Sequence, residues 1–174
     1  MPTDSSDTPN SFISTERCLE ATGERMSGFP LERIRLLRLI AHIQRAIETF
    51  TNRVLYPHGL SYSSYITLMM LYGSPDFSLT PSALSEATGE RRNNITRISD
   101  DLVKKGLIAR EVSQTDRRCF ILTLNQEGRR LLEYIQPKLW ANLNETFGDF
   151  SNDELQLLRQ LLHKQLTGMD KHRE

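Results

Sequence analysis

The chain has 174 residues with no net formal charge, and its hydrophobic fraction of 38% includes seven Phe, five Tyr and one Trp. This is enough apolar material for one domain, or for one small domain with a helical appendage, and it excludes a wholly disordered chain. No run of about 18 apolar residues and no basic start followed by an apolar stretch occurs, so we expect a cytosolic protein without a membrane span. Cys18 and Cys119 have no metal-ligand spacing and are expected as reduced thiols.

The first third of the chain predicts an arm followed by two helices. Residues 1–29 are rich in Ser, Thr, Asp and Gly and are expected to form a mobile arm, although residues 12–26 could form a short helix on a partner surface. After Pro30, apolar residues recur at three- and four-residue steps and predict an amphipathic helix of about 25 residues. Ser61 is placed to cap a second helix, which ends at Gly73.

A helix-turn-helix follows. Thr80 before Pro81 predicts the N-cap and first position of a short helix, and Gly89 predicts the turn after it. In the next helix one side is apolar and the other polar, which is typical of a recognition helix. The apolar side has Ile95, Ile98 and Leu102, and the polar side and its flanks have Asn93, Asn94, Thr96, Arg97 and Lys104.

The sequence then predicts a β-hairpin and two more helices. Residues 107–112 and 119–124 are rich in strand-forming residues, and the polar segment SQTDRR between them predicts an exposed hairpin tip, or wing. Asn125 is placed to cap a long helix that Pro137 is expected to bend. Ser151 begins a capping box before a leucine-rich last helix. The predicted fold class is mainly α with a small β wing.

Positive charge is concentrated in one part of this neutral chain. Residues 91–130 contain ten Lys or Arg and five Asp or Glu. The excess depends on where the window begins, because Glu86 and Glu90 lie just before it. A local basic patch on a neutral protein favours a specific DNA-binding protein over a non-specific polycation.

Four segments of the sequence resemble the MarR family of winged-helix transcriptional regulators: LTPSALSEATG, NNITRISDDLVKKGLIAR, DRR and LTLNQEGRRLLE. TRISDDLVKKGLIARE and TDRRCF are similar to the branch that represses multidrug efflux operons. The resemblance implies a homodimer in which the first and last helices of two chains interlace and two winged helices meet successive major grooves of a palindromic operator. Such half-sites lie about 34 Å apart and require a two-fold pair of recognition helices.

The expected division is therefore an arm at 1–29, a dimerisation region at 30–57 plus 125–174, and a DNA-binding domain at 58–124. The alternative is that the first and last helices close the core of a monomer.

The expected DNA contacts lie on the second helix of the helix-turn-helix and on the wing. Asn pairs with adenine and Arg with guanine in the major groove, while the arginines of a hairpin tip suit the minor groove. A carboxylate at Asp116 can hold a neighbouring guanidinium in place, and the resemblance favours Arg118 as the groove arginine. Simple exposure to solvent is the alternative at each position. The candidates are Arg92 (to a phosphate), Asn93, Asn94, Thr96 and Arg97 on the helix, and Asp116, Arg117 and Arg118 on the wing.

The chain departs from the family at Glu90 and Arg91, which occupy positions that small hydroxylated residues often hold. A carboxylate there suits the helix dipole, but it is expected to repel a phosphate at the helix start.

The resemblance also implies an effector cavity between the dimerisation helices and the winged helix, for a hydrophobic, phenolic or anionic molecule. Ordinary interhelical packing is the alternative. The candidate lining residues are His42, Arg45, Tyr62, Tyr65, Met69, Met70 and Tyr72.

The sequence thus predicts a ligand-responsive dimeric repressor of efflux or stress genes. A winged-helix module that binds a protein partner is one alternative, and a redox-sensing regulator acting through Cys119 is another. An enzyme is not expected, because no nucleophile-base pair or phosphate loop occurs. No cofactor and no metal are expected either, since His58, His163 and His172 have no ligand spacing.

Overall fold

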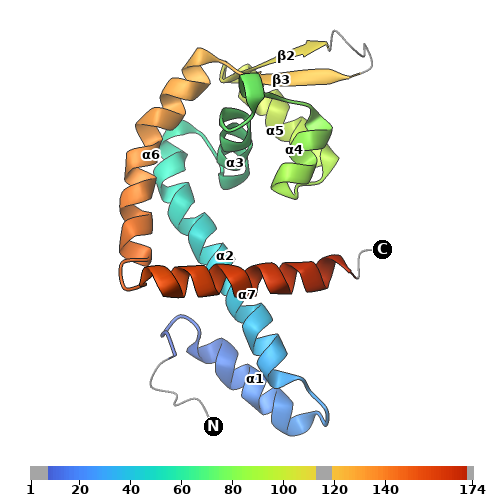
Figure 1. Cartoon of the computed structure of the whole chain (residues 1–174), viewed down its shortest axis with the longest axis vertical. Coiled ribbons are helices and arrows are strands. Elements are labelled where there is room, and N and C mark those ends of the chain that lie inside the picture. Colours follow the sequence, from blue (N-terminus) through green and yellow to red (C-terminus); the bar gives the residue numbers. More distant parts are fainter. Residues whose placement is uncertain (1–7, 113–118, 172–174) are drawn as a thin grey trace. The chain divides into compact units, whose positions relative to one another are not determined.

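The computed structural model describes residues 8–112 and 119–171, which form helices and a three-stranded antiparallel sheet (Figure 1). The chain divides into two compact units, residues 1–129 and 130–174, and each is described by itself. In the described part of the chain, no helix combines the length and apolarity needed to cross a membrane. The elements are α1 (Ile13–Arg25), α2 (Leu31–Leu55), η1 (Tyr56–His58), α3 (Tyr62–Tyr72), η2 (Pro75–Phe77), β1 (Ser78–Leu79), α4 (Pro81–Thr88), α5 (Arg92–Lys104), β2 (Ile108–Val112), β3 (Phe120–Leu124), α6 (Gln126–Thr146) and α7 (Asn152–Asp170).

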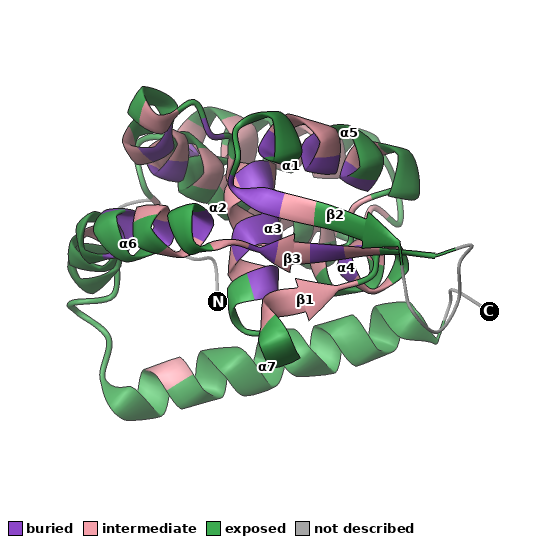
Figure 2. Cartoon of the chain, turned by 90° about the horizontal axis from the view of Figure 1, so that it is seen from above, coloured by how far each residue is buried: buried purple, intermediate pink, exposed green. Residues whose placement is uncertain are grey.

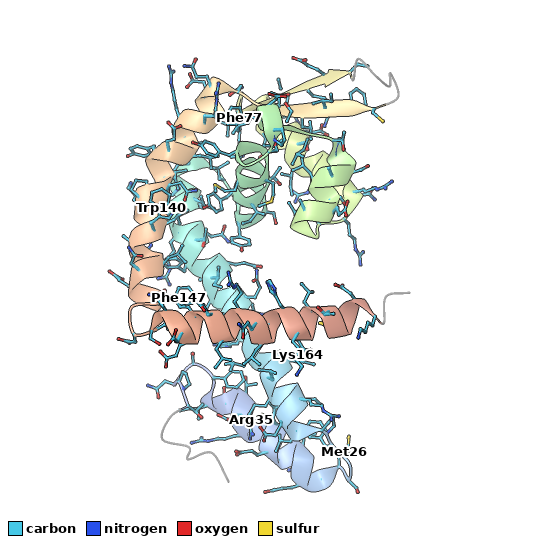
Figure 3. All side chains as sticks on the ribbon, viewed as in Figure 1. Met26, Arg35, Phe77, Trp140, Phe147 and Lys164 are labelled. Atoms are coloured by element: carbon cyan, nitrogen blue, oxygen red, sulfur yellow. The ribbon has the colours of Figure 1, made fainter. Side chains whose placement is uncertain are left out.

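The N-terminal arm differs from the expectation, because much of it forms α1. Arg35 of α2 points toward α1, where its guanidinium pairs with the carboxylates of Glu16 at 2.9 Å and Glu20 at 3.5 Å (Figure 3). Phe12 is 3% exposed and meets the ring of His42 edge to face, with 5.5 Å between centroids. The surface that orders this helix therefore belongs to the chain's own α2, and ion pairs contribute to the contact.

The helix boundaries of the winged helix follow the predicted caps. Ser61 begins α3 and its hydroxyl accepts a hydrogen bond from the Ser64 N–H at 3.2 Å. Thr80 does the same for α4, with Pro81 at the first helical position. Each cap satisfies a backbone N–H that has no partner inside its helix, so these starts are fixed by local sequence.

α3, α4 and α5 gather below the β2–β3 hairpin and share one core with the sheet (Figure 1). The apolar side predicted for α5 is confirmed as its buried side. Each of these core side chains is at most 2% exposed: Leu68, Leu71, Leu84, Ile95, Ile98, Leu102 and Leu122. The recognition helix is thus held from behind by close packing, which leaves its polar side outward.

β2 and β3 confirm the predicted hairpin within a residue at each end, with Val112 opposite Phe120. β1 was not predicted, since two residues are too short to show alternation. It pairs with β3, and the hydroxyls of Ser78 and Thr123 lie 2.8 Å apart. The strand order is β1-β3-β2.

The start of α6 requires a glycine. The predicted cap is confirmed, because Asn125 Oδ1 accepts a hydrogen bond from the Gly128 N–H at 3.0 Å. A Cβ atom on Gly128 would lie 2.4 Å from the carbonyl oxygen of Leu107 and 2.5 Å from Leu124 Cδ1. Only glycine permits the helix to approach the hairpin this closely.

The second unit contains α6 from residue 130 onward and the whole of α7. Ser151 and Glu154 form the predicted capping box at the start of α7. No residue of α7 is buried, and Figure 2 shows the helix exposed along nearly its whole length. Its exposed large apolar side chains are Leu157, Leu158, Leu161, Leu162, Leu166 and Met169. The leucine pattern therefore forms an amphipathic helix whose apolar side is not covered within its own unit.

Candidate nucleic-acid interface

The exposed side of α5 carries most of the predicted base-contacting residues. Arg92, Asn93, Thr96 and Arg97 are exposed, and Asn94 is half-buried. The Thr96 hydroxyl donates to the carbonyl oxygen of Arg92 at 3.1 Å, which leaves its methyl group and one lone pair for other contacts. The helix-turn-helix therefore presents a polar and basic surface of the kind that reads base edges.

The hairpin is fastened to the recognition helix by an ion pair. Arg110 of β2 lies 2.7 Å from the carboxylate of Asp100 on α5, and its guanidinium carbon lies 5.8 Å from the centroid of the Phe120 ring on β3. The two candidate DNA-contacting elements are thus coupled. The predicted wing residues Asp116, Arg117 and Arg118 lie outside the described residues.

Glu90 joins the three helices of the domain. Its carboxylate accepts a hydrogen bond from the Ser63 hydroxyl of α3 and another from the Asn94 amide of α5, both at 2.6 Å. Its carbonyl oxygen accepts from the Ser85 hydroxyl of α4 at 2.7 Å. The Ser63 bond, then the Asn94 bond, and the positive charge of Arg97 hold the pKa of Glu90 below its ordinary value, against the opposing effect of burial.

This network changes the interpretation of two predicted residues. The carboxylate of Glu90, which is expected to repel a phosphate at the helix start, accepts hydrogen bonds from two groups inside the domain. The amide of Asn94 donates to Glu90 and accepts from Arg97 Nη2 at 2.8 Å. Bidentate pairing with adenine needs both ends of that amide to face a base, so the geometry favours a supporting role for Asn94 and leaves Arg97 as the outermost group.

Part of the basic excess is used inside the protein. Lys105 donates to the Gly59 carbonyl oxygen at 2.6 Å and also pairs with Asp101. The Arg129 guanidinium lies 4.7 Å from the centroid of the Phe77 ring, a cation-π contact. Charge counting along the sequence cannot show which basic side chains pair with groups of the protein itself.

The effector candidates divide into two groups. A hollow of about 420 Å³ follows one side of α2, and its lining residues are His42, Arg45, Ala46, Thr49, Phe50 and Arg53. Of the predicted set it includes only His42 and Arg45. Tyr62, Tyr65, Met69, Met70 and Tyr72 lie on α3 and do not line it, and the Tyr72 ring packs edge to face on Phe77. The lining residues that the sequence did not suggest are Ala46, Thr49, Phe50 and Arg53. They follow His42 and Arg45 at three- and four-residue steps, which is the spacing of one side of a helix.

Cys119, the candidate redox residue, is exposed just before β3, and Cys18 is exposed on α1. Among the described residues, no group of three or more His, Cys, Asp or Glu side chains is placed to hold a metal ion.

Comparison with known proteins identifies the family. Residues 58–118 match the profile described as MarR family. Transcriptional repressor MprA of Escherichia coli strain K12 is 34% identical over 161 residues, which cover 92% of each chain. The chain belongs to the MarR family. HTH-type transcriptional regulator PrsX of Escherichia coli is 26% identical, over 92% of this chain and 97% of PrsX. These relatives are transcriptional regulators and not enzymes, and the predicted membership of the MarR family is confirmed.

Solved structures of MarR-family proteins show the same fold. A cysteine-to-serine variant of MarR from Escherichia coli, complexed with operator DNA, matches with a TM-score of 0.70 and 26% identity over 78% of this chain and 96% of that chain. AbsC from Streptomyces coelicolor matches with a TM-score of 0.71 and 21% identity over 78% of this chain and 93% of AbsC. The predicted winged-helix fold, mainly α with a small sheet, is confirmed.

Proposed function

We propose that this protein is a dimeric transcriptional repressor that binds palindromic operator DNA, with α5 in the major groove and the hairpin beside it. The observation that carries the proposal is the division of α5 into a buried side, with Ile95 and Ile98, and an exposed side that presents Asn93 and Arg97. The similarity to the repressor MprA and to MarR bound to operator DNA supports it.

The dimer is supported by the uncovered apolar side of α7. Leu158 and Leu162 are 38% and 43% exposed, and the helix has no buried residue. Fully burying an exposed leucine side chain is worth about 1.5–3 kcal/mol, so covering the exposed part of several leucines on each copy of this helix stabilises a dimer. A two-fold pair also supplies the two recognition helices that a palindrome needs.

The control signal is proposed to be a small anionic or aromatic molecule that binds the hollow along α2. Arg45, Arg53 and His42 supply positive or hydrogen-bonding groups there, and Phe50 supplies an aromatic surface. An effector that favours a different spacing of the recognition helices needs a coupling of about 1–3 kcal/mol to weaken DNA binding. Genes for drug efflux or stress response are the proposed targets.

The test is a fluorescence anisotropy titration of the protein on the duplex that lies upstream of its own gene, at several salt concentrations. Arg97→Ala is expected to weaken discrimination between this duplex and a scrambled one. Arg118→Ala is expected to weaken binding to both and to reduce the salt slope by about one. Arg159→Ala, which removes an arginine from α7, serves as the charge-matched control and is expected to bind as the wild type does.

If the wild-type protein binds both duplexes equally and with no salt dependence, the DNA-binding proposal is overturned and a module for a protein partner takes its place. Equal binding by Arg97→Ala, Arg118→Ala and wild type would show instead that α5 and the wing are not the reader.

A further inference from the structure

The carboxylate of Glu90 is the first member of a hydrogen-bonded series that ends at Arg97. Glu90 Oε2 accepts from the Asn94 amide nitrogen, and Asn94 Oδ1 accepts from Arg97 Nη2. Glu90 lies in the turn just before α5, and Asn94 and Arg97 follow on the first turns of that helix. The series is held at its base by the Ser63 hydroxyl, which belongs to α3 and bonds the other carboxylate oxygen.

We propose that Glu90 is a positioning residue that aims the Arg97 guanidinium through Asn94 and so determines which base pair Arg97 distinguishes. The inference rests on the proposed DNA-binding function. Glu90 itself touches no DNA in it, because both of its carboxylate oxygens face groups of the domain.

Three features favour this role over a random surface bond. The Asn94 amide is oriented by chemistry, since its nitrogen faces a carboxylate and its oxygen faces a guanidinium. With the Asn94 amide reversed, two hydrogen-bond donors would face each other at the arginine end and two acceptors at the carboxylate end. The carboxylate end is fixed by α3, a separate helix whose Ser64 and Thr67 are buried. The arginine end is exposed, so the ordered guanidinium points out of the domain, where a base edge would lie.

The physical effect of this arrangement is preorganisation. An arginine on a helix surface samples many rotamers, and holding it in one before binding removes the ordering penalty from the DNA-binding step. A guanidinium held in one direction gains binding free energy at a base whose acceptors match that direction, and little at other bases. The effect is therefore on discrimination between base pairs. Phosphate contacts set overall affinity and salt dependence, and Glu90 supplies none. The ordering penalty of one long side chain corresponds to about two- to tenfold in binding.

A structural role for Glu90 makes a different prediction. If the residue only fastens the turn between α4 and α5, its loss shifts the whole recognition helix, and binding to every duplex falls together. The position-by-position pattern of base discrimination therefore separates the two roles.

The experiment begins with selection from a randomised duplex library by the wild-type protein, which gives a consensus site. Dissociation constants are then measured by anisotropy on the consensus and on duplexes with each base pair changed in turn. The variants are Arg97→Ala, Glu90→Ala, the double variant and Glu90→Gln. Glu86→Ala is the matched control, because it removes the same charge from the exposed surface of α4. Circular dichroism is recorded for each.

Arg97→Ala is expected to abolish discrimination at one base pair in each half-site. Glu90→Ala is expected to reduce discrimination at that same pair about two- to tenfold, with the other pairs and the salt slope unchanged. The double variant should match Arg97→Ala at that pair, since Glu90 acts only through the arginine. Glu90→Gln, which keeps an acceptor for Asn94, should retain more discrimination than Glu90→Ala, and Glu86→Ala should behave as wild type.

Several results would overturn the inference. Unchanged discrimination in Glu90→Ala, a uniform loss across all duplexes, or additive effects in the double variant each show that Glu90 does not aim Arg97, while the proposed DNA binding stands. If Glu90→Ala does not fold, Ser63→Ala, which removes one of the two bonds to the carboxylate, is expected to reduce discrimination at the same pair by a smaller factor, and no reduction there overturns the inference. If wild type enriches no sequence, the proposed function fails and the inference fails with it.

Discussion

In the winged helix, Leu84 and Leu102 are fully buried, whereas Leu161 and Leu166 of α7 are 55% and 57% exposed. Both regions are amphipathic helices with leucines at helical spacing, so the sequence pattern alone does not distinguish them. The winged helix surrounds its leucines with α3, α4, α5 and the sheet, all from one stretch of chain. α7 lies in a unit that offers it no such cover. A self-sufficient core and an association surface can therefore share one pattern and differ only in what lies opposite.

The largest expected effect comes from the uncovered region. Leu162→Gln replaces an apolar side chain by a polar one in both protomers of the proposed dimer. Losing the burial of the exposed part of the leucine and burying an amide without a partner together cost about 1.5–3 kcal/mol per protomer, and the resulting loss of about 3–6 kcal/mol raises the dimer dissociation constant about 10²- to 10⁴-fold. Sedimentation equilibrium measures this constant. His163→Gln puts the same residue on the polar side of the helix and is expected to leave it unchanged. Equal constants for Leu162→Gln and wild type would remove α7 from the interface and break the comparison.

The buried region should respond in stability instead of assembly. Leu84→Ala leaves a cavity beside fully buried neighbours and is expected to lower the free energy of unfolding by about 2–5 kcal/mol. Urea denaturation at one fixed protein concentration gives this value, and sedimentation at low temperature should show an unaltered dissociation constant. Val103→Ala, on the exposed side of α5, is the control, with a change within about 0.5 kcal/mol. If the Leu84→Ala dimer dissociates before the chain unfolds, then the core of the winged helix also supports assembly, and the two regions are not independent.

The same contrast explains how much of the fold the sequence predicts. Caps such as Ser61, Thr80 and Ser151 act within four residues, so helix starts were read correctly from local sequence. The core side of α5 followed from periodicity. β1 is not predicted from the sequence, and α1 is predicted only as a helix that a partner surface would order. Each depends on a partner elsewhere in the chain, β3 for β1 and Arg35 of α2 for α1.

The positions of the candidate residues on α5 could be predicted from the sequence, but the way these residues contact one another could not. Asn94 and Arg97 were placed correctly on the exposed side of α5 and its flank, but periodicity gives only the direction of a side chain from the helix axis. That Asn94 is held between Glu90 and Arg97 depends on hydrogen-bond geometry and on Ser63, which lies 27 residues before Glu90. Glu90 departs from the family pattern, but the sequence predicts from this only that its carboxylate repels a phosphate, and not that it bonds Ser63 and Asn94.

A smaller effect tests whether the winged helix is set by local signals as well as by its core. Thr80→Ala removes the hydroxyl that accepts from the Ala83 N–H at the start of α4, and is expected to lower the free energy of unfolding by about 1 kcal/mol. Ser82→Ala, in the exposed first turn of the same helix, is the control and should change stability less. Thermal or urea unfolding of the two variants provides the measurement. A loss as large as that of Leu84→Ala would mean that α4 depends on its cap as much as on its core contacts.

The smallest expected effect concerns the carboxylate of Glu90, which joins α3 and α5 of the winged helix. Hydrogen bonds from Ser63 and Asn94 lower the pKa of Glu90 from its ordinary 4.5. A lowered pKa in the folded state means that the carboxylate stabilises the fold fully above the unfolded value and loses this contribution as the pH falls through the folded value. The difference in free energy of unfolding between wild type and Glu90→Gln should therefore be constant above the pKa of the unfolded state. It should shrink as the pH falls from there through the pKa of the folded state. Urea titrations across the acid range measure it, with Glu86→Gln as the charge-matched control. A difference that persists undiminished in acid would show that the hydrogen bonds to residue 90, and not its ionisation, stabilise the turn.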